Sequence, residues 1–562
     1  MSITMRTKKT GARFIAETLK GCGVTHVFYI DAILRHTLVE METLGIERIV
    51  THSEKAAAYM ADGYARVGHK PGVCMAQSVG AANLAAGLQD AYLGCSPVIA
   101  LTGRKPPYYR QRNAYQEIVH GPLFEPVTKY NVDVVELEQL PGCLRQAFRE
   151  ATTGTPRPVH LDRRGARGEL LEQAEGALEI VIEDDFSRCP AHRLEPEPEK
   201  VRQAAAALAA VERPVIVAGG GVRASSAGPE ITELAEMLSI PVATSVNGKG
   251  AIPENHPLSV GVVGSYSRWC ANRVVSEADL VVFIGSRTGD QVTLDWTIPK
   301  PGTRIIQIDI APAELGRNYP GVIGLAGDAQ VAVRKLVVAL KPKPVNEQWA
   351  RQARQWVREW QAEFEPRLNS GAVPIRPERL CQELSDLLPE NAVLVSDTGY
   401  SAIWSGTMVR LTHPEQSYIR AAGSLGWAFP AALGVKCAAP KRPVLCFTGD
   451  GGFLYHLSEL ETAARYGINT VTIVNNNSGL GQGVPGINAA YGDKPGDREA
   501  LYRFRETNYA RIAQEMGCLG IRVERPDEIP GALRQALDAN APVVVDILTN
   551  IEYHAPTPWR LS

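Results

Sequence analysis

Short apolar runs of strand length alternate with helix-spaced apolar positions along most of the chain. In the first third, this pattern predicts strands at residues 24–29, 46–50, 72–77, 97–102 and 158–162, and helices at 12–21, 53–67 and 81–91. Such alternation is typical of a parallel sheet covered by helices. The predicted fold class is therefore α/β, with a doubly wound parallel sheet.

The same alternation returns twice further along the chain. Strands are predicted at 214–218, 241–244, 280–284 and 304–308, and then at 392–396, 443–447 and 470–474. Polar stretches that contain proline, at 187–199 and 341–346, separate these units, and a polar helix is predicted at 347–367. We therefore predict three doubly wound parallel-sheet domains, at residues 1–186, 195–342 and 370–562. The first and third are expected to share one architecture.

Composition and charge narrow the function classes. The 562 residues are 45% hydrophobic and 21% charged, as in ordinary globular proteins, and a net charge of -2 gives no electrostatic basis for binding nucleic acid or an acidic membrane surface. Neither a membrane-spanning apolar run nor a signal peptide is evident. Ten cysteines without a CxxC pair or a Cys/His cluster indicate a cytoplasmic protein without structural zinc.

The third unit carries the strongest chemical signal. Its strand at 443–447 runs into a turn that consists of Gly449, Asp450, Gly451 and Gly452, and the strand at 470–474 ends in three asparagines. A glycine turn before a helix favours anions, because free N–H groups and the helix dipole both attract negative charge. Asp450 and Asn477 offer the oxygen ligands that Mg²⁺ or Ca²⁺ prefers. The pattern predicts a metal-bridged phosphate site; the alternative is a tight turn without a ligand.

The spacing between these groups resembles the signature of the thiamine diphosphate (ThDP) decarboxylase and carboligase superfamily. Asn477, the last of the asparagines, follows Asp450 by 27 residues. The order of the three predicted domains also matches that family, as pyrimidine-binding, central and diphosphate-binding domains. The resemblance covers nearly the whole chain. It implies that Asp450, Asn477 and the backbone carbonyl of Gly479 hold Mg²⁺ on the diphosphate of ThDP, beside the glycine turn.

Glu54 opens the predicted helix at 53–67, in a segment that resembles the family motif around a cofactor-binding glutamate. In that motif the carboxylate meets ring nitrogen N1′ of the aminopyrimidine, which favours the tautomer that removes the C2 proton. The resemblance therefore implies that Glu54 binds the cofactor and takes part in catalysis. Alternatively, Glu54 only complements the positive end of its helix.

Two loops of the third unit are assigned by the same resemblance. Gly423 and Leu425 lie where the family bends ThDP into a V, with Gly423 at the pyrimidine and Leu425 between the rings. The same segment could also be a plain strand-to-helix turn. Gly399 and Ser401 follow the strand at 392–396, and the resemblance places their loop near the diphosphate, with Ser401 as a hydrogen-bond donor.

Three positions concern the substrate: Gln116, Asp31 and the segment that follows Asn477. Gln116 lies in a segment that resembles acetolactate synthases, where the equivalent region lines the access to C2. Asp31 follows the first predicted strand, where most members of the family have a glycine-rich turn. Asp31 is either an acid near the cofactor or part of a different turn. No tryptophan follows Asn477 in the segment that selects the second 2-oxoacid in acetolactate synthases.

The central unit has glycines at strand ends, at 219–221 and 285, and a later acid, Asp309. These features are what an adenine dinucleotide site needs. Relatives bind FAD there, or ADP, or nothing. The segments 261–265 and 287–290 depart from the patterns of the flavin-dependent acetolactate synthases, which argues against FAD. FAD, ADP and an empty central domain all stay open.

The resemblance as a whole implies an acetolactate synthase-like carboligase of the large catalytic subunit type. Such an enzyme decarboxylates a 2-oxoacid, here pyruvate, and joins the activated fragment to a second carbonyl compound. One alternative is a 2-hydroxyacyl-CoA or oxalyl-CoA type lyase or decarboxylase, and another is a non-catalytic ThDP-binding paralogue. In this family the active site lies between subunits, which implies a homodimer or homotetramer.

Overall fold

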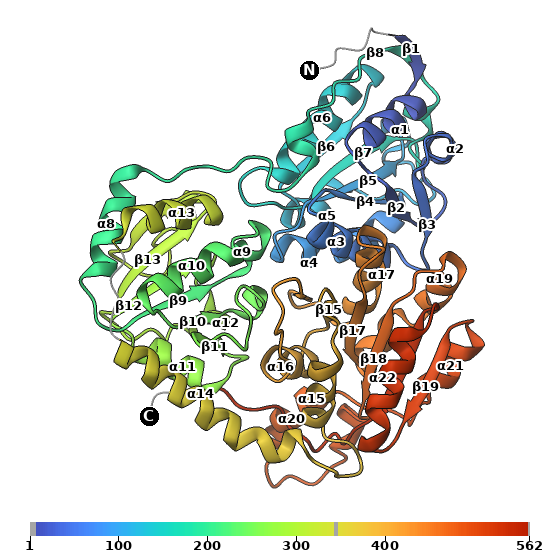
Figure 1. Cartoon of the computed structure of the whole chain (residues 1–562). Helices are drawn as coiled ribbons and strands as arrows, with labels where there is room; N and C mark the ends of the chain where they lie inside the picture. The colour runs from blue at the N-terminus through green and yellow to red at the C-terminus, as the bar shows by residue number, and fades with distance from the viewer. Residues whose placement is uncertain (1–6, 342–346, 560–562) are drawn as a thin grey trace.

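The computed structural model describes residues 7–341 and 347–559. Most of the predicted linker at 341–346, and the outermost residues of the predicted domains 1–186 and 370–562, therefore lie outside the described residues. Figure 1 shows three α/β bodies, coloured blue, green and orange to red along the chain. Each contains a six-stranded sheet whose strands all run parallel. The predicted fold class is confirmed.

The first and third sheets have the same topology. The first has the order β3-β2-β4-β5-β7-β6 and the third has the order β16-β15-β17-β18-β20-β19. The first sheet consists of β2 (His26–Tyr29), β3 (Glu47–Val50), β4 (Gly72–Gln77), β5 (Val98–Arg104), β6 (Tyr130–Val134) and β7 (Val159–Arg164). The third consists of β15 (Val393–Ser396), β16 (Ser417–Arg420), β17 (Val444–Gly449), β18 (Val471–Asn476), β19 (Leu519–Val523) and β20 (Val543–Leu548). The expectation that one architecture is used twice is confirmed.

The central sheet has a different order, β11-β10-β9-β12-β13-β14. Its strands are β9 (Pro214–Ala218), β10 (Val242–Thr244), β11 (Ser259–Val262), β12 (Leu280–Ile284), β13 (Arg304–Asp309) and β14 (Ile323–Ala326). Counted from its first strand, this is the 3-2-1-4-5-6 order of dinucleotide-binding domains. The topological switch point lies between β9 and β12, at whose carboxyl ends ligands bind in open α/β sheets.

The hydrophobic pattern missed the edge strands β6, β11, β14, β16 and β19, and also β20, which lies between β18 and β19. In β6 only Val134 is buried, and Asn131 and Asp133 interrupt any apolar run. An edge strand is covered on fewer sides than a central one, so it does not need a continuous apolar sequence. Central strands such as β4, β9 and β12 were predicted with the bounds that the structure shows.

A close crossing of two helices joins the first and third domains. Helix α3 (Glu54–Gly68) packs against α17 (Ala428–Ala438), which lies between the two sheets in Figure 1. A Cβ at Gly63 would lie 2.1 Å from the carbonyl oxygen of Ala431, and one at Gly434 would lie 1.9 Å from that of Met60. The two backbones therefore touch, and neither position has room for a side chain.

Helix α14 (Glu347–Leu368) leads from the central to the third domain. It buries Trp349, Trp356 and Trp360 on one face and exposes polar residues on the other. Among the helices of the described ranges, none combines the length and apolar character that a bilayer crossing requires.

We expect Gly63→Ala to destabilise the protein by about 2–3 kcal/mol, because an added methyl group forces the α3 and α17 backbones apart. Chemical denaturation of the purified variant measures this change. Gly142→Ala is a matched control in helix α6 (Leu140–Thr152), where no atom lies within 4 Å of an added Cβ. The control should be neutral or about 0.5–1 kcal/mol more stable. Equal stability of the two variants would contradict the close crossing.

Candidate active site

The turn after β17 holds Asp450 in a buried position. Asp450 begins the short helix α18 (Asp450–Phe453), is 2% exposed, and accepts a 2.8 Å hydrogen bond from the backbone N–H of Gly479 through Oδ2. Burial raises the pKa of Asp450 to about 7. The adjacent strand β18 ends at Asn476, so Asn477 and Gly479 lie beside Asp450 at the carboxyl edge of the sheet.

The donor set at this edge fits a divalent cation. Asn477 Oδ1 is buried and has no hydrogen-bond partner among the described residues. Buried polar atoms without partners are rare, and one beside a desolvated carboxylate is suited to coordinate a metal ion. Carboxylate, amide and carbonyl oxygens are the ligands of Mg²⁺ and Ca²⁺. The residues present therefore fit the predicted metal.

The glycines around Asp450 are fixed by close packing. A Cβ at Gly451 would lie 2.7 Å from Leu480, and one at Gly452 would lie 2.9 Å from Thr448 Oγ1. Gly399 has φ +68°, a left-handed conformation that glycine adopts without strain. Ser401 Oγ lies 3.5 Å from the position of a Cβ at Gly449. The loops after β15 and β17 are thus side by side, with Ser401 next to the glycine turn.

A buried carboxylate supports the loop that carries Gly423 and Leu425. Asp397 follows β15, and its carboxylate accepts hydrogen bonds from the backbone N–H groups of Gly426 at 3.0 Å and Ala428 at 3.2 Å. It also accepts a hydrogen bond from the N–H of Thr398, next to Gly399, at 2.8 Å. Burial raises the pKa of Asp397 to about 6. Asp397 therefore fixes both the Leu425 loop and the start of the Gly399 loop.

Glu54 lies on the first domain, at the start of α3. Ser53 caps the helix by accepting the N–H of Ala56, and Glu54 Oε2 accepts a 3.2 Å hydrogen bond from Asn83. A Cβ at Gly80 would lie 2.4 Å from Glu54 Oε1, so the glycine leaves room for the carboxylate. The third domain anchors this corner, because Glu459 accepts the N–H of His52 at 2.9 Å.

Gln116 and Asp31 also lie on the first domain. The backbone carbonyl of Gln116 accepts a hydrogen bond from Ser78, which follows β4, and its φ is +62°. Asp31 forms a largely exposed ion pair with Arg35 at 2.6 Å, and the hydrogen bond from Arg35 lowers its pKa. Asp31 is therefore an ionised partner of Arg35, and its role as an acid near a cofactor stays a prediction.

The structure gathers the predicted residues into two groups. Asp450, Asn477, Gly479, Gly399, Ser401, Gly423 and Leu425 lie at the carboxyl edge of the third sheet, and Glu54, Gln116 and Asp31 lie at that of the first. Sequence reasoning assigned no role to Asp397 or Glu459. Asp397 follows an apolar strand, which is a usable signal, whereas Glu459 looks like any acid in the first turn of a helix.

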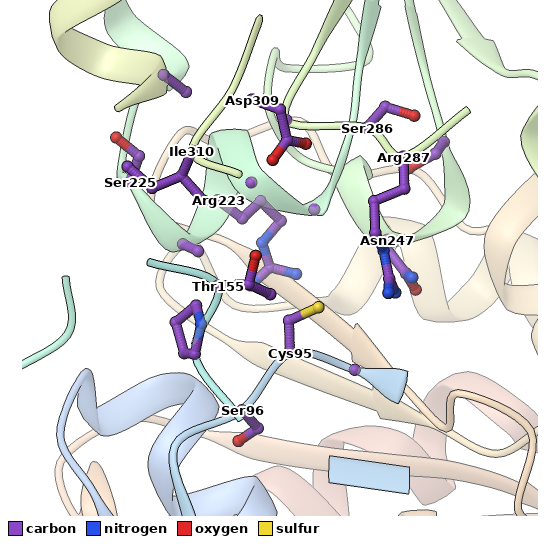
Figure 2. A pocket seen from close by; sticks show the side chains of 18 of the residues that line it. Cys95, Ser96, Thr155, Arg223, Ser225, Asn247, Ser286, Arg287, Asp309 and Ile310 are labelled. Carbon is purple, nitrogen blue, oxygen red and sulfur yellow. The ribbon is translucent and has the colours of Figure 1, made fainter. Parts of the chain in front are cut away.

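A cavity of about 620 Å³ lies between the central domain and the other two. Figure 2 shows Arg223 extending from the central domain toward Thr155 of the first, with Asp309 on the other side. No acidic side chain of the described residues forms an ion pair with Arg223, which is half-buried and lines the cavity, and desolvation lowers its pKa to about 10. A partly desolvated cation without a counter-charge favours an anionic ligand.

Domain families match most of the chain, and similar proteins match nearly its full length. The N-terminal TPP binding domain of thiamine pyrophosphate enzymes matches residues 9–123, their central domain matches 201–336, and their C-terminal TPP binding domain matches 397–547. A "probable acetolactate synthase large subunit" of Methanocaldococcus jannaschii is 35% identical over 96% of this chain and 91% of the relative. The acetolactate synthase large subunit of Haemophilus influenzae is 30% identical over 97% of this chain and 96% of the relative. The acetolactate synthase isozyme 1 large subunit of Escherichia coli is 32% identical over 85% of this chain and 83% of the relative.

We expect Asp397→Asn to weaken ThDP binding about tenfold at pH 7.5, because an amide cannot accept all the N–H groups that the carboxylate accepts. The pKa of Asp397 is raised, so its anion is lost as the pH falls through about 6. The difference from the wild type should therefore shrink below pH 6. Calorimetric titration with ThDP and Mg²⁺, at pH 7.5 and below pH 6, measures the ThDP affinity of the variant and of the wild type. Asp386→Asn, at an exposed carboxylate of the same domain, is the control, and a ratio independent of pH would refute the role.

Proposed function

We propose, from the premise that this chain belongs to the thiamine pyrophosphate enzyme family, that it decarboxylates pyruvate and joins the remaining acetyl unit to a second carbonyl compound. The observation that carries the proposal is the group formed by buried Asp450, unpartnered Asn477 Oδ1 and Gly479 in a chain so similar to acetolactate synthase large subunits. The cofactors are ThDP, also called thiamine pyrophosphate, and Mg²⁺.

The third domain holds the diphosphate end of the cofactor. Asp450 and Asn477 ligate Mg²⁺ through side-chain oxygens, and Gly479 does so through its carbonyl. The glycine turn lets the backbone approach the diphosphate, and Ser401, beside Gly449, donates a hydrogen bond to it. Charge is matched in this arrangement, because the cation balances both the diphosphate and the buried Asp450 carboxylate.

The first domain controls the proton. Glu54 would hydrogen-bond ring nitrogen N1′ of the aminopyrimidine, and Gly423 and Leu425 of the third domain would hold that ring. When bound, ThDP supplies the carbon nucleophile and electron sink that decarboxylation of a 2-oxoacid requires. Gln116 is the residue proposed to contact the substrate, and its backbone carbonyl accepts a hydrogen bond from Ser78.

The overall reaction balances without an external oxidant. The C1–C2 bond of pyruvate breaks, C1 leaves as CO₂, and C2 forms a bond to the carbonyl carbon of the acceptor. The acceptor oxygen becomes a hydroxyl group by taking up one proton. Because Glu54 and the Asp450 group lie on different domains, we propose that a site combines the first domain of one subunit with the third domain of another. The smallest active unit is then a homodimer.

The central cavity is proposed as the site of an adenine nucleotide, either ADP or FAD. The central sheet has the strand order of dinucleotide-binding domains, and the cavity lies at its switch point. In this proposal, Asp309 accepts hydrogen bonds from the ribose hydroxyl groups, and the positive charge of Arg223 pairs with a phosphate group. Gly219 and Gly221 also have a packing role, since a Cβ at either would lie within 2.6 Å of Gly285.

A second candidate function is a lyase or decarboxylase that acts on 2-hydroxyacyl-CoA or oxalyl-CoA. The observation that favours it is the segment after Asn477, which runs from Ser478 to Gly486 without a tryptophan. The unpaired Arg223 favours a phosphorylated ligand in either case. The two functions differ in donor and in the expected nucleotide.

We expect protein incubated with ThDP, Mg²⁺ and pyruvate to form acetolactate or acetoin, detected by mass spectrometry. Glu54→Gln should keep ThDP binding but lower product formation and C2 proton exchange by about 100-fold or more, because general acid–base help is lost. The matched control is Glu47→Gln, at an exposed carboxylate at the start of β3.

Unchanged turnover in Glu54→Gln would defeat its assigned role. C2 proton exchange in the wild type without any product from pyruvate would exclude pyruvate as donor and favour the acyl-CoA alternative.

The purified protein should release ADP or FAD on denaturation, and Arg223→Ala should reduce the bound amount at least tenfold. Arg304→Ala is the control, because Arg304 lies at the amino end of β13, away from the cavity. Released ADP favours the acyl-CoA function, and released FAD favours the synthase. If the wild type releases neither, and binds neither by calorimetry, the cavity is not a nucleotide site.

A further inference from the structure

The segment at 421–427 joins β16 to α17 and carries Gly423 and Leu425. It has no regular structure, so its backbone N–H groups need partners from elsewhere. Asp90 of the first domain accepts hydrogen bonds from two of these N–H groups. Ala422 donates to Asp90 Oδ1 at 2.8 Å and Ser424 donates to Oδ2 at 3.0 Å. Each oxygen of this carboxylate therefore accepts a different amide of the Leu425 segment.

Asp90 is completely buried on helix α4 (Gly80–Leu93), and its charge is balanced by Arg66 of α3. Arg66 Nη2 lies 3.1 Å from Asp90 Oδ1, and Arg66 Nη1 donates to the backbone carbonyl of Arg420 at 2.8 Å. Arg420 directly precedes the segment. The Arg66–Asp90 pair thus holds the entry of the segment as well as its first half.

The far end of the segment contacts the same network. Trp427 Nε1 donates to Asp62 Oδ2 at 2.9 Å, and Asp62 also forms an ion pair with Arg66 at 2.6 Å. Near this segment, Asp397 of the third domain accepts hydrogen bonds from the amides of Gly426 and Ala428, both of which follow Leu425. The residue between the two carboxylate clamps is Leu425 itself, flanked by Ser424 on one side and Gly426 on the other.

We propose that Asp90 is a positioning residue for the reaction, which sets the place of Leu425 and so the bend of the bound cofactor. The proposal rests on the proposed function of Leu425. A carboxylate can accept both N–H groups at once, whereas an amide has one accepting oxygen and one donating nitrogen. Loss of one clamp leaves Leu425 free to shift, and a shift of about 1 Å can cost roughly 100-fold in rate. The first domain of each chain therefore aligns the cofactor loop of its own third domain. Helix α3, which supplies Arg66 to this network, also carries Glu54.

The test is Asp90→Asn, with C2 hydrogen–deuterium exchange of bound ThDP measured by acid quench and NMR. We expect exchange to slow about 10- to 100-fold, while the Kd for ThDP with Mg²⁺ changes less than about threefold, because the diphosphate end is held elsewhere. Asp279→Asn is the matched control, since Asp279 accepts the N–H groups of Glu212 and Arg213 in the central domain. If Asp90→Asn does not fold, Asp90→Glu keeps the charge beside Arg66 but displaces its oxygens, and the same slowing is expected.

A double-mutant cycle separates positioning from a structural role. If Asp90 acts through Leu425, then Asp90→Asn should slow exchange by less than about twofold in a Leu425→Ala background. Effects that simply multiply would overturn the inference, as would normal exchange in both Asp90 variants. If Leu425→Ala alone leaves exchange and ThDP affinity unchanged, the proposed role of Leu425 fails, which is a different result from failure of Asp90 alone.

Discussion

The backbone contact between α3 and α17 is the constraint on which the rest of the site depends. Gly63 faces the Ala431 carbonyl and Gly434 faces the Met60 carbonyl, so these helices approach as closely as two backbones can. Helix α3 begins at Glu54, and α17 begins where the Leu425 segment ends. A wider helix crossing would move Glu54 relative to the Leu425 segment. The apolar core continues through this junction, because Ala57 and Tyr64 of α3 belong to the same buried cluster as Phe429 and Ala432 of α17.

Four buried aspartates in and beside the site are stabilised in different ways. Asp62 and Asp90 share the guanidinium of Arg66. Asp397 has only backbone N–H groups and one hydroxyl, and its pKa is raised. Asp450 has the N–H of Gly479, and in the proposed complex it gains a cation. Buried charges persist only when they are paired or hydrogen-bonded, so each partner set indicates what its aspartate does. The paired aspartates join domains. Of the two without an ionic partner, Asp397 accepts several backbone N–H groups, whereas Asp450 lies beside the unpartnered Asn477 Oδ1 and would ligate the metal of the proposed complex.

The three sheets differ in strand order or in the loops at their carboxyl edges, and each difference corresponds to a different part of the proposed site. The first and third share one strand order but present different loops at their carboxyl edges, a glutamate at a helix start in one and a glycine turn with oxygen ligands in the other. The central sheet has the other order and places its switch point at the 620 Å³ cavity. In the proposed dimer, a repeated architecture with different edge loops supplies both halves of one site, while the central sheet remains available for a separate ligand.

The sequence by itself determined the α/β alternation, most of the central strands and the grouping of Asp450 with Asn477, because strand length, glycine turns and strand ends are local features with a short-range pattern. It missed the central strand β20. It did not predict the edge strand β6, which is only partly buried. It could not assign Asp90 or Asp397 either. Asp90 resembles any acid on an alanine-rich helix until the fold brings it against Ser424, which is 334 positions away. Only the tertiary structure decided these contacts, since the partner of a buried carboxylate is set by how domains pack, and no local pattern records that.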